Sequence, residues 1–300
     1  GEVLNLVLPG TSTIPASDNK KLRKAREAGK YAVEMARAGR KPSELITKEV
    51  LLNSIMFDMA VAGSTNAVLH ILSYAYELGI KLTLEDFEKY AKEIPCINAV
   101  VPSGPYTVVD FHYAGGVMNV MKMLENKLYT DVPSMYGNTW KDMLAVVKPQ
   151  ENKVIHSLER PLFQEPGLKI LRGNLSPNGA IVRPTAVYDE VKYMKGKAKV
   201  FEGDRSAFEA IQAGEIVPGD IIVIRYEGCK GAPGMKELML SIDALIGLGL
   251  HKSVGLISDA RFSGFNFGAI IGHVSPEAYD GGTIALVENG DEIVIDIPNG

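Results

Sequence analysis

The stretch 221–268 holds the residues that point most clearly to chemistry. An apolar run from Ile221 to Tyr226 predicts a strand, and a glycine-rich turn follows it. A second predicted strand, from Val254 to Ser258, leads into the sequence DARFSG at 259–264. Loops that follow strands place functional side chains on a rigid scaffold. The stretch therefore predicts a site built from these two loops.

Glu237 and Ser263 are the side chains of this stretch best suited to a reaction. Glu237 is predicted to lie in the first turn of a helix, where a carboxylate could ligate a hard cation such as Mg²⁺. The simpler alternative is that Glu237 only interacts favourably with the helix dipole. Ser263 follows a strand, and a serine can act as a general base where cations stabilise its alkoxide. Arg261 is close enough in sequence to assist, and Gly264 keeps the turn open.

A second candidate is the sequence GSTN at 63–66, which falls between two predicted helices. The polar groups of Ser64, Thr65 and Asn66, with the first N–H groups of the following helix, could receive an anion such as a carboxylate. The alternative is that Ser64 simply caps the helix while Gly63 allows close packing. Both interpretations remain open at the level of sequence.

Metal-binding patterns are otherwise missing from the sequence. The five histidines form no pair at metal-ligand spacing, and Cys96 and Cys229 have no neighbouring Cys or His at such spacing. The chain alone is therefore not expected to ligate an iron–sulfur cluster or a structural zinc ion. Two isolated cysteines fit a reducing cytoplasm.

Composition excludes several classes of protein. With 46% hydrophobic and 23% charged residues, the chain has the composition of a globular protein. The net charge of −4 gives no electrostatic footprint for nucleic acid. Apolar runs end well short of the ~20 residues of a membrane span, and no secretory signal opens the chain. Both ends of the 300 residues resemble cuts through a longer protein.

The first half of the chain has the periodicity of helices. Apolar residues recur at helical spacing in 20–38, 48–62, 67–78, 83–94, 115–124 and 139–147. Ser17 or Asp18, Thr83 and Thr139 precede three of these segments as expected N-caps. Gly79 marks the end of the helix expected at 67–78.

After about residue 150 the pattern changes to short apolar runs separated by turn residues. The expected strands are 168–172, 180–187, 198–201, 221–226, 254–258, 284–287 and 292–297. Asn289-Gly290 predicts a hairpin between the last two. Two helices are also expected, one capped by Asp204 and one from about Met235 to Ile246. The chain is thus predicted to be an α/β protein, with a helical half followed by a β-barrel or sandwich with peripheral helices.

Short motifs occur throughout the chain in a specific order and spacing. They are LPG (8–10), AGSTN (62–66), PSG (102–104), AGG (114–116), LRGNL (171–175), PGD (218–220), RYEG (225–228), GMKE (234–237), DARFSG (259–264) and GHVSPEA (272–278). On these motifs the chain resembles the family of dihydroxy-acid and phosphogluconate dehydratases, which also contains sugar-acid dehydratases. The resemblance covers essentially all 300 residues.

The resemblance implies a two-domain hydro-lyase. Residues 1–150 would be the last part of an α/β domain that carries an iron–sulfur cluster. Residues 151–300 would be a β-barrel similar to the swivelling domain of aconitases. By the same resemblance, Glu237 is the Mg²⁺-ligating glutamate and Ser263 the serine that abstracts a proton. Ser64, Thr65, Asn66, Arg261 and Gly264 are the expected substrate-binding residues.

The reaction so implied is dehydration of a 2,3-dihydroxy acid to a 2-keto acid. The iron of the cluster, of 2Fe–2S or 4Fe–4S type, would act on the 3-hydroxyl, Mg²⁺ would hold the carboxylate and 2-hydroxyl, and Ser263 would take the C2 proton. The motif at 272–278 favours the dihydroxy-acid dehydratase of valine and isoleucine biosynthesis. Family members are typically homodimers, so a cytoplasmic homodimer with a small-molecule substrate is expected, without nucleic-acid or membrane partners.

Departures from the family pattern keep two alternatives open. Family members usually continue Ser-Gly-Gly-Thr where this chain has Phe265 and Asn266 after Gly264, which favours a sugar-acid dehydratase acting on an aldonate or phosphogluconate. The cluster cysteines, the other Mg²⁺ carboxylates and a modified lysine of the family would lie before Gly1, and Cys96 and Cys229 match none of them. The second alternative is therefore a non-catalytic fragment, and the chain alone is expected to be inactive.

Overall fold

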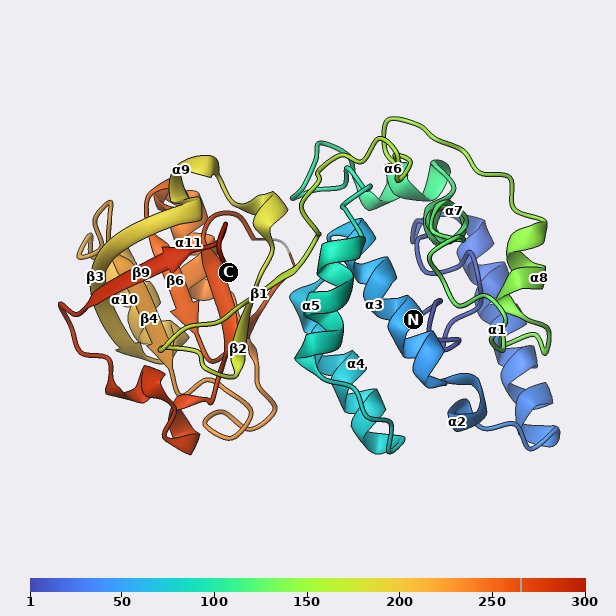
Figure 1. The fold of residues 1–300 in the computed structure, drawn as a ribbon, viewed down its shortest axis with the longest axis horizontal. Helices are drawn as coiled ribbons and strands as arrows, with labels where there is room; N and C mark the ends of the chain where they lie inside the picture. The colour runs from blue at the N-terminus through green and yellow to red at the C-terminus, as the bar shows by residue number, and fades with distance from the viewer. Residues whose placement is uncertain (265) are drawn as a thin grey trace. The chain divides into compact units, whose positions relative to one another are not determined.

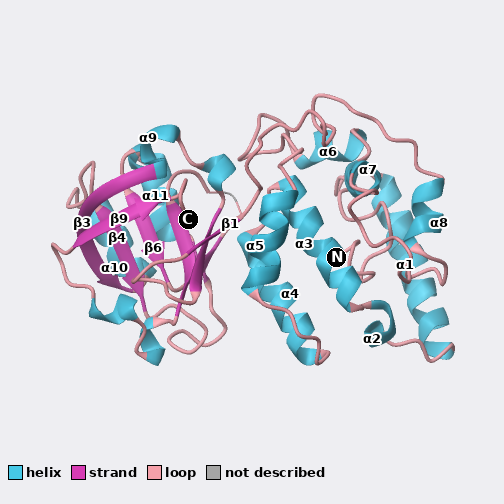
Figure 2. Cartoon of the chain, in the orientation of Figure 1, coloured by secondary structure: helices cyan, strands magenta, loops and turns pink. Residues whose placement is uncertain are grey.

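A computed structural model describes residues 1–264 and 266–300, in two compact units. The first unit comprises Gly1–Gly63 and Val68–Pro166, and the second comprises Ser64–Ala67 and Gly167–Gly300. Helices dominate the first half of the chain and strands the second, as the colours of Figure 2 show, so the predicted α/β class is confirmed. In the described part of the chain, no helix combines the length and hydropathy needed to cross a membrane.

Six of the eight helices described in the first half match predicted segments. The eight are α1 (Asn19–Arg37), α2 (Pro42–Leu45), α3 (Lys48–Val61), α4 (Thr65–Glu77), α5 (Leu84–Glu93), α6 (Val108–Tyr113), α7 (Gly116–Met123) and α8 (Trp140–Ala145) (Figure 1). Helices α2 and α6 were not predicted. The Asp18 side chain accepts from the Lys20 N–H and the Thr139 side chain from the Asp142 N–H, which confirms two predicted caps. Helix α3 is the core of the first unit, because Leu51, Ile55 and Met59 are fully buried.

The second unit is built on one curled sheet, drawn in yellow to red in Figure 1. Among the described residues it has seven strands in the order β1-β2-β8-β6-β4-β3-β9. Their bounds are β1 (Lys169–Leu171), β2 (Gly179–Val182), β3 (Tyr193–Glu202), β4 (Ile221–Arg225), β6 (Gly255–Ser258), β8 (Ile270–Ser275) and β9 (Glu292–Asp296). Neighbours from β3 to β8 pair in parallel, whereas β1–β2, β2–β8 and β3–β9 pair antiparallel.

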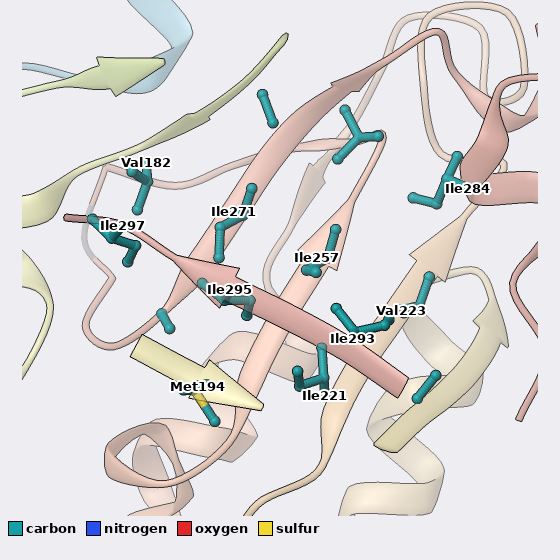
Figure 3. Close-up of a cluster of buried hydrophobic side chains, with 14 of the residues drawn as sticks. Val182, Met194, Ile221, Val223, Ile257, Ile271, Ile284, Ile293, Ile295 and Ile297 are labelled. Carbon is teal, nitrogen blue, oxygen red and sulfur yellow. The ribbon is translucent and has the colours of Figure 1, made fainter. Parts of the chain in front are cut away.

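Both faces of this sheet are buried. Strand β4 shows how: Ile221 and Val223 join one apolar cluster, while Ile222 and Ile224 join another on the opposite face. Figure 3 shows the first cluster, where side chains from β2, β4, β6, β8 and β9 meet inside the curl. The second cluster includes residues of helices α10 (Asp204–Gln212) and α11 (Leu240–Gly247). A strand buried on both faces reads as a continuous apolar run, as the sequence of β4 does.

Two predictions for this half are wrong near its end. Residues Thr283–Leu286 form the 3₁₀ helix η4 and not a strand, so Asn289-Gly290 does not connect a hairpin. The partner of β9 is β3, whose ten residues offer β9 a full antiparallel edge.

The predicted strand 180–187 ends early, because Pro184 opens the 3₁₀ helix η1 (Pro184–Ala186). The remaining short elements are α9 (Asp189–Lys192), η2 (Leu250–Lys252) and η3 (Ala278–Asp280).

The helix predicted from Met235 also begins elsewhere. Glu237 and Leu238 form the two-residue strand β5, and α11 starts only at Leu240. The Asp204 carboxylate determines this start, because it accepts hydrogen bonds from the N–H groups of Met239, Leu240 and Ser241 at 3.1, 3.1 and 3.0 Å. The prediction that Asp204 caps its own helix is therefore wrong. Gly203 occupies the N-cap position of α10, and Asp204 is its first residue.

Candidate active site

A two-stranded parallel ribbon links the loops of Glu237, the predicted metal ligand, and Ser263, the predicted base. Strand β5 (Glu237–Leu238) pairs with β7 (Arg261–Phe262), with Glu237 opposite Arg261 and Leu238 opposite Phe262. Parallel pairing aligns the ends of the two strands, so Ser263 follows directly after the residue that faces Leu238. Glu237 therefore lies opposite Arg261, and Ser263 comes two positions after Arg261, although 26 positions separate Glu237 from Ser263 in sequence.

Asn66 joins both strands of the ribbon. Its side-chain Nδ2 donates to Glu237 Oε1 at 2.8 Å and to the Phe262 carbonyl at 3.1 Å. Because both amide hydrogens are used in this way, the amide orientation is fixed. The other side-chain atom, Oδ1, is buried and has no hydrogen-bond partner among the residues described. Asn66 therefore holds the candidate metal ligand and the candidate base loop in register and keeps one acceptor free.

The other residues of the 63–66 motif behave differently from one another. Ser64 Oγ accepts from the Asn66 N–H at 3.2 Å, so Ser64 does cap helix α4, as the simpler interpretation held. Thr65 is fully buried, and its hydroxyl makes no hydrogen bond within the described ranges. A Cβ at Gly63 would lie 1.7 Å from Asp58 Oδ1, so this position has room only for glycine. The motif thus combines a helix cap with a contact to the ribbon.

Arg261 fixes the backbone just before Glu237. Its Nε donates to the Met235 carbonyl at 2.5 Å. Met235 has a φ of 43°, a left-handed conformation that residues other than glycine seldom adopt. The bond from Arg261 therefore helps to set the direction in which the chain enters β5.

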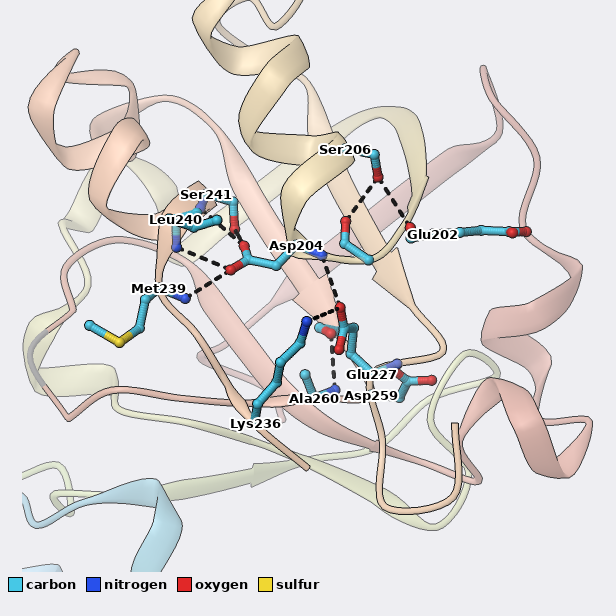
Figure 4. Close-up of polar contacts among 12 residues, drawn as sticks. Glu202, Asp204, Ser206, Glu227, Lys236, Met239, Leu240, Ser241, Asp259 and Ala260 are labelled. Atoms are coloured by element: carbon cyan, nitrogen blue, oxygen red, sulfur yellow. Dashed lines mark hydrogen bonds and ion pairs between the residues drawn. The ribbon is translucent and has the colours of Figure 1, made fainter. Parts of the chain in front are cut away.

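Two carboxylates secure the ends of the segment that carries Glu237 (Figure 4). Before Glu237, Lys236 Nζ forms an ion pair with Glu227 Oε1 at 3.3 Å, and that oxygen also accepts from the Asp204 N–H at 3.1 Å. After Glu237, the Asp204 carboxylate holds the Met239 N–H. Asp204 and Glu227 are both buried, so their carboxylates are shielded from water, whereas the Lys236 side chain is 67% exposed. The position of Glu237 is therefore determined from both sides.

Asp259 plays the same part for the loop that carries Ser263. Its carboxylate accepts from the N–H groups of Tyr226, Glu227 and Ala278 at 3.1, 3.1 and 2.9 Å. Burial raises the pKa of Asp259, and these three backbone hydrogen bonds act in the opposite direction. Asp259 thereby ties the loops after β4 and β8 to the start of the base loop.

The loop beyond β7 is held by two further residues. Asn266 Nδ2 donates to the Ser263 carbonyl at 2.7 Å, and Arg183 Nη1 donates to the Gly264 carbonyl. Asn266 and Arg183 are both buried. Phe265, which the sequence comparison singled out, lies outside the described residues.

His273 is a buried histidine behind the base loop. Its backbone N–H donates to the Ala260 carbonyl at 2.9 Å, and its ring lies 6.2 Å from that of Phe262. Neither ring nitrogen has a hydrogen-bond partner among the residues that the structure describes. Burial, with a smaller contribution from the Arg261 charge, lowers the pKa of His273 to about 4. The imidazole is therefore neutral at physiological pH.

This pKa makes stability depend on pH. Since the pKa of His273 is lower in the folded than in the unfolded state, the unfolded state binds more protons between pH 6.5 and about 4, and stability is lost as pH falls through this window. Between pH 7 and pH 5, His273 alone is expected to lower the free energy of unfolding by about 2 kcal/mol. Urea titrations of the natural polypeptide and of His273→Asn at both pH values measure this; asparagine tolerates the φ of 56°. An equal pH dependence in the two proteins would show that His273 does not carry the effect.

The described residues fit one implied metal in part and the implied cluster not at all. Glu237 offers a hard anionic oxygen of the kind that Mg²⁺ prefers. Within the described ranges, no three His, Cys, Asp or Glu side chains could together hold a metal ion. Both cysteines are free, Cys96 buried and Cys229 exposed, and neither belongs to a group of three such side chains among the described residues.

Sequence reasoning missed three residues that build this site. Asp204 was expected only as the cap of its own helix and Glu227 was named only within the RYEG motif, because their partners are distant in sequence. Arg183 lies inside the predicted strand 180–187, and nothing in the sequence distinguishes it from a solvent-exposed arginine. Asp259 lies in the DARFSG motif, and its place directly after a buried strand was the one available sign that it matters.

Comparison with known proteins matches the whole length of the chain. Residues 1–143 match the family described as dihydroxy-acid/6-phosphogluconate dehydratase N-terminal, and residues 153–300 match its C-terminal counterpart. A protein of Methanosarcina barkeri named dihydroxy-acid dehydratase is 45% identical over 301 residues, which cover 99% of this chain and 54% of that protein. Proteins of the same name from Clostridium novyi and Ignicoccus hospitalis are also 45% identical, with the same coverage.

The chain spans about half the length of the curated relatives that it matches. The match is nevertheless continuous, since it includes both the helical half and the half that carries the ribbon. On the strength of both matched regions and of 45% identity over 99% of its residues, the chain belongs to the dihydroxy-acid/6-phosphogluconate dehydratase family.

Proposed function

We propose that this chain supplies the catalytic base and one Mg²⁺ ligand of a dihydroxy-acid dehydratase. The observation that carries the proposal is the parallel pairing of β5 with β7, because it places Glu237 on the same ribbon that leads directly into Ser263. The names of the relatives support the dihydroxy-acid substrate. Ser263 is the base, Glu237 the metal ligand, and Ser64, Thr65, Asn66, Arg261 and Gly264 bind or position the substrate.

The chemistry is an elimination of water. Ser263 takes the proton from C2, the electron pair of that C–H bond forms the C2=C3 double bond, and the 3-hydroxyl leaves and becomes water with a proton. The resulting enol tautomerises to the 2-keto acid. Mg²⁺, when bound at Glu237, would hold the carboxylate and 2-hydroxyl and stabilise the negative charge that develops at C2. Asn66 orients Glu237, and the network around Asp204, Glu227 and Asp259 keeps both loops in place.

The iron–sulfur cluster is assigned no step here. Neither cysteine fits as a ligand, so in this proposal the cluster, of either type, is bound by residues outside this chain. The 300 residues by themselves are accordingly proposed to be inactive, and formation of 2-keto acid by them alone after cluster reconstitution would refute this. We further propose a homodimer in the cytoplasm that acts in branched-chain amino-acid biosynthesis.

A sugar-acid dehydratase is the second candidate. It is favoured by Asn266, because this buried amide holds the Ser263 carbonyl where other family members are expected to have a threonine. Turnover of 2,3-dihydroxy-isovalerate and of gluconate by the natural polypeptide, assayed as 2-keto acid at saturating Mg²⁺, separates the two. We expect the dihydroxy acid to react faster; activity on gluconate alone would contradict the first candidate.

A further inference from the structure

We propose that the free edge of β9 binds an additional β-strand, supplied by a part of the natural polypeptide outside these 300 residues. The inference goes beyond the proposed dehydration and does not depend on it. Among the described residues, β1 and β9 are the end strands of the curled sheet, so each pairs with a neighbour on one side only. An end strand leaves a row of backbone donors and acceptors that can pair with another strand.

The hydrogen-bond pattern shows which backbone groups of β9 face this free edge. Just before β9, the Ala198 N–H donates to the Asp291 carbonyl at 2.8 Å. Just after it, the Ile297 N–H donates to the Lys192 carbonyl at 2.9 Å. Because bonded positions alternate in an antiparallel pair, the odd-numbered residues of β9 bond to β3 and the even-numbered ones point away from it. Within the described part of the chain, the N–H and carbonyl groups of Val294 have no partner on that side.

The two end strands lie on either side of one opening in the second unit. Lys169 of β1 reaches across it, since its Nζ donates to the Ile297 carbonyl at 2.7 Å. A hollow of about 140 Å³ is lined by Leu171 on the side of β1 and by Ile295 on the side of β9. It extends to Ile271 of the apolar cluster inside the curl, so the core of this unit borders the opening.

A second hollow continues along β9 and provides further space. It measures about 440 Å³ and is lined by residues 291–294 together with Leu175 and Leu286. Leu175 and Val294 line both hollows, so the two together follow β9 over its whole length. The cluster beneath the opening is apolar, and side chains of a strand alternate between its faces. The added strand should therefore carry an apolar residue at every second position.

The strand is assigned to the same polypeptide because the relatives offer the residues for it. The chain covers 54% of the matched relatives, so close to half of each relative lies outside the matched region. A strand that is covalently linked to the sheet binds at a high effective concentration, which a second molecule does not have. Filling the opening would also close the curled sheet and leave neither edge exposed, and closure is how barrels avoid edge-to-edge association.

Amide hydrogen exchange of the natural polypeptide tests whether the edge is covered. We expect the Val294 N–H to exchange at least about a hundredfold more slowly than in an unstructured peptide. The Ile293 N–H, which faces β3, is the internal control and should be protected in any case. Exchange of Val294 at the rate of an unstructured peptide, with Ile293 protected, would overturn the proposal.

Photocrosslinking then identifies what covers the edge. Val294 is replaced by p-benzoylphenylalanine in the natural polypeptide, and Val217, which is equally exposed at 52% but far along the chain, is replaced in the matched control. We expect Val294 alone to give a cross-link at the mass of one polypeptide, to a segment outside the 300 residues. A product at the mass of two polypeptides would assign the edge to a second copy and overturn the proposal. Cross-links confined to the 300 residues, or none, would overturn it as well.

Discussion

Replacing Ser263 with alanine in the natural polypeptide is expected to lower 2-keto-acid formation by at least about a hundredfold, because a positioned general base contributes two to four orders of magnitude. The fold should be unaffected, because the substitution removes one hydroxyl oxygen and keeps the backbone carbonyl that accepts from Asn266. Turnover of 2,3-dihydroxy-isovalerate and the circular dichroism spectrum measure the two effects.

A matched control is available on helix α4. Ser73 is exposed, and its hydroxyl bonds to the Leu69 carbonyl within the helix, so Ser73→Ala removes the same atom away from the site. It should retain full turnover. Near-normal turnover by Ser263→Ala would show that Ser263 is not the base and would remove the mechanism, although family membership would stand.

Glu237→Gln is expected to weaken activation by Mg²⁺ by at least about tenfold. The physical reason is that the substitution removes a negatively charged oxygen ligand, and even indirect disturbance of a metal ligand costs 10- to 100-fold in affinity. Glutamine keeps an oxygen that can accept from Asn66 Nδ2, so the ribbon should persist. Turnover as a function of Mg²⁺ concentration gives the measurement.

The control for Glu237 is Glu209→Gln, at an exposed position on α10. An unchanged Mg²⁺ titration in Glu237→Gln would mean that the carboxylate has a purely structural role. That role could not be the favourable helix interaction considered from the sequence, because Glu237 lies in strand β5 and outside any helix. The structural alternative would instead be its hydrogen bond with Asn66.

The sequence predicts the elements whose stability is local. Helices such as α1 and α5 are amphipathic, and the side chains of Asp18 and Thr139 cap α1 and α8 through nearby backbone N–H groups. Strands β4 and β6 are continuous apolar runs, because both of their faces are buried. Strand β8 was not predicted, because Gly272 interrupts its apolar pattern. Gly272 must lack a side chain, since a Cβ there would lie 2.2 Å from the Phe262 ring.

The site itself could be predicted only in part. The sequence and the family resemblance selected Glu237 and Ser263 but could not show that one ribbon links their loops, because β5 and β7 have two residues each and are too short to give a periodic pattern. The start of α11 depends on Asp204, 36 positions earlier, and the base loop depends on Arg183, 81 positions from Gly264. Such long-range hydrogen bonds leave no periodic trace in a sequence.

The most direct test of the account follows the hydrogen on C2. The natural polypeptide would be given 2,3-dihydroxy-isovalerate deuterated at C2, in ordinary water, and the 2-keto acid would be analysed by mass spectrometry. Because Ser263 is proposed to remove this hydrogen as a proton and the enol then takes its C3 proton from solvent, the product should contain no deuterium. A product that keeps the deuterium at C3 would show migration from C2 to C3 and would contradict proton abstraction by Ser263.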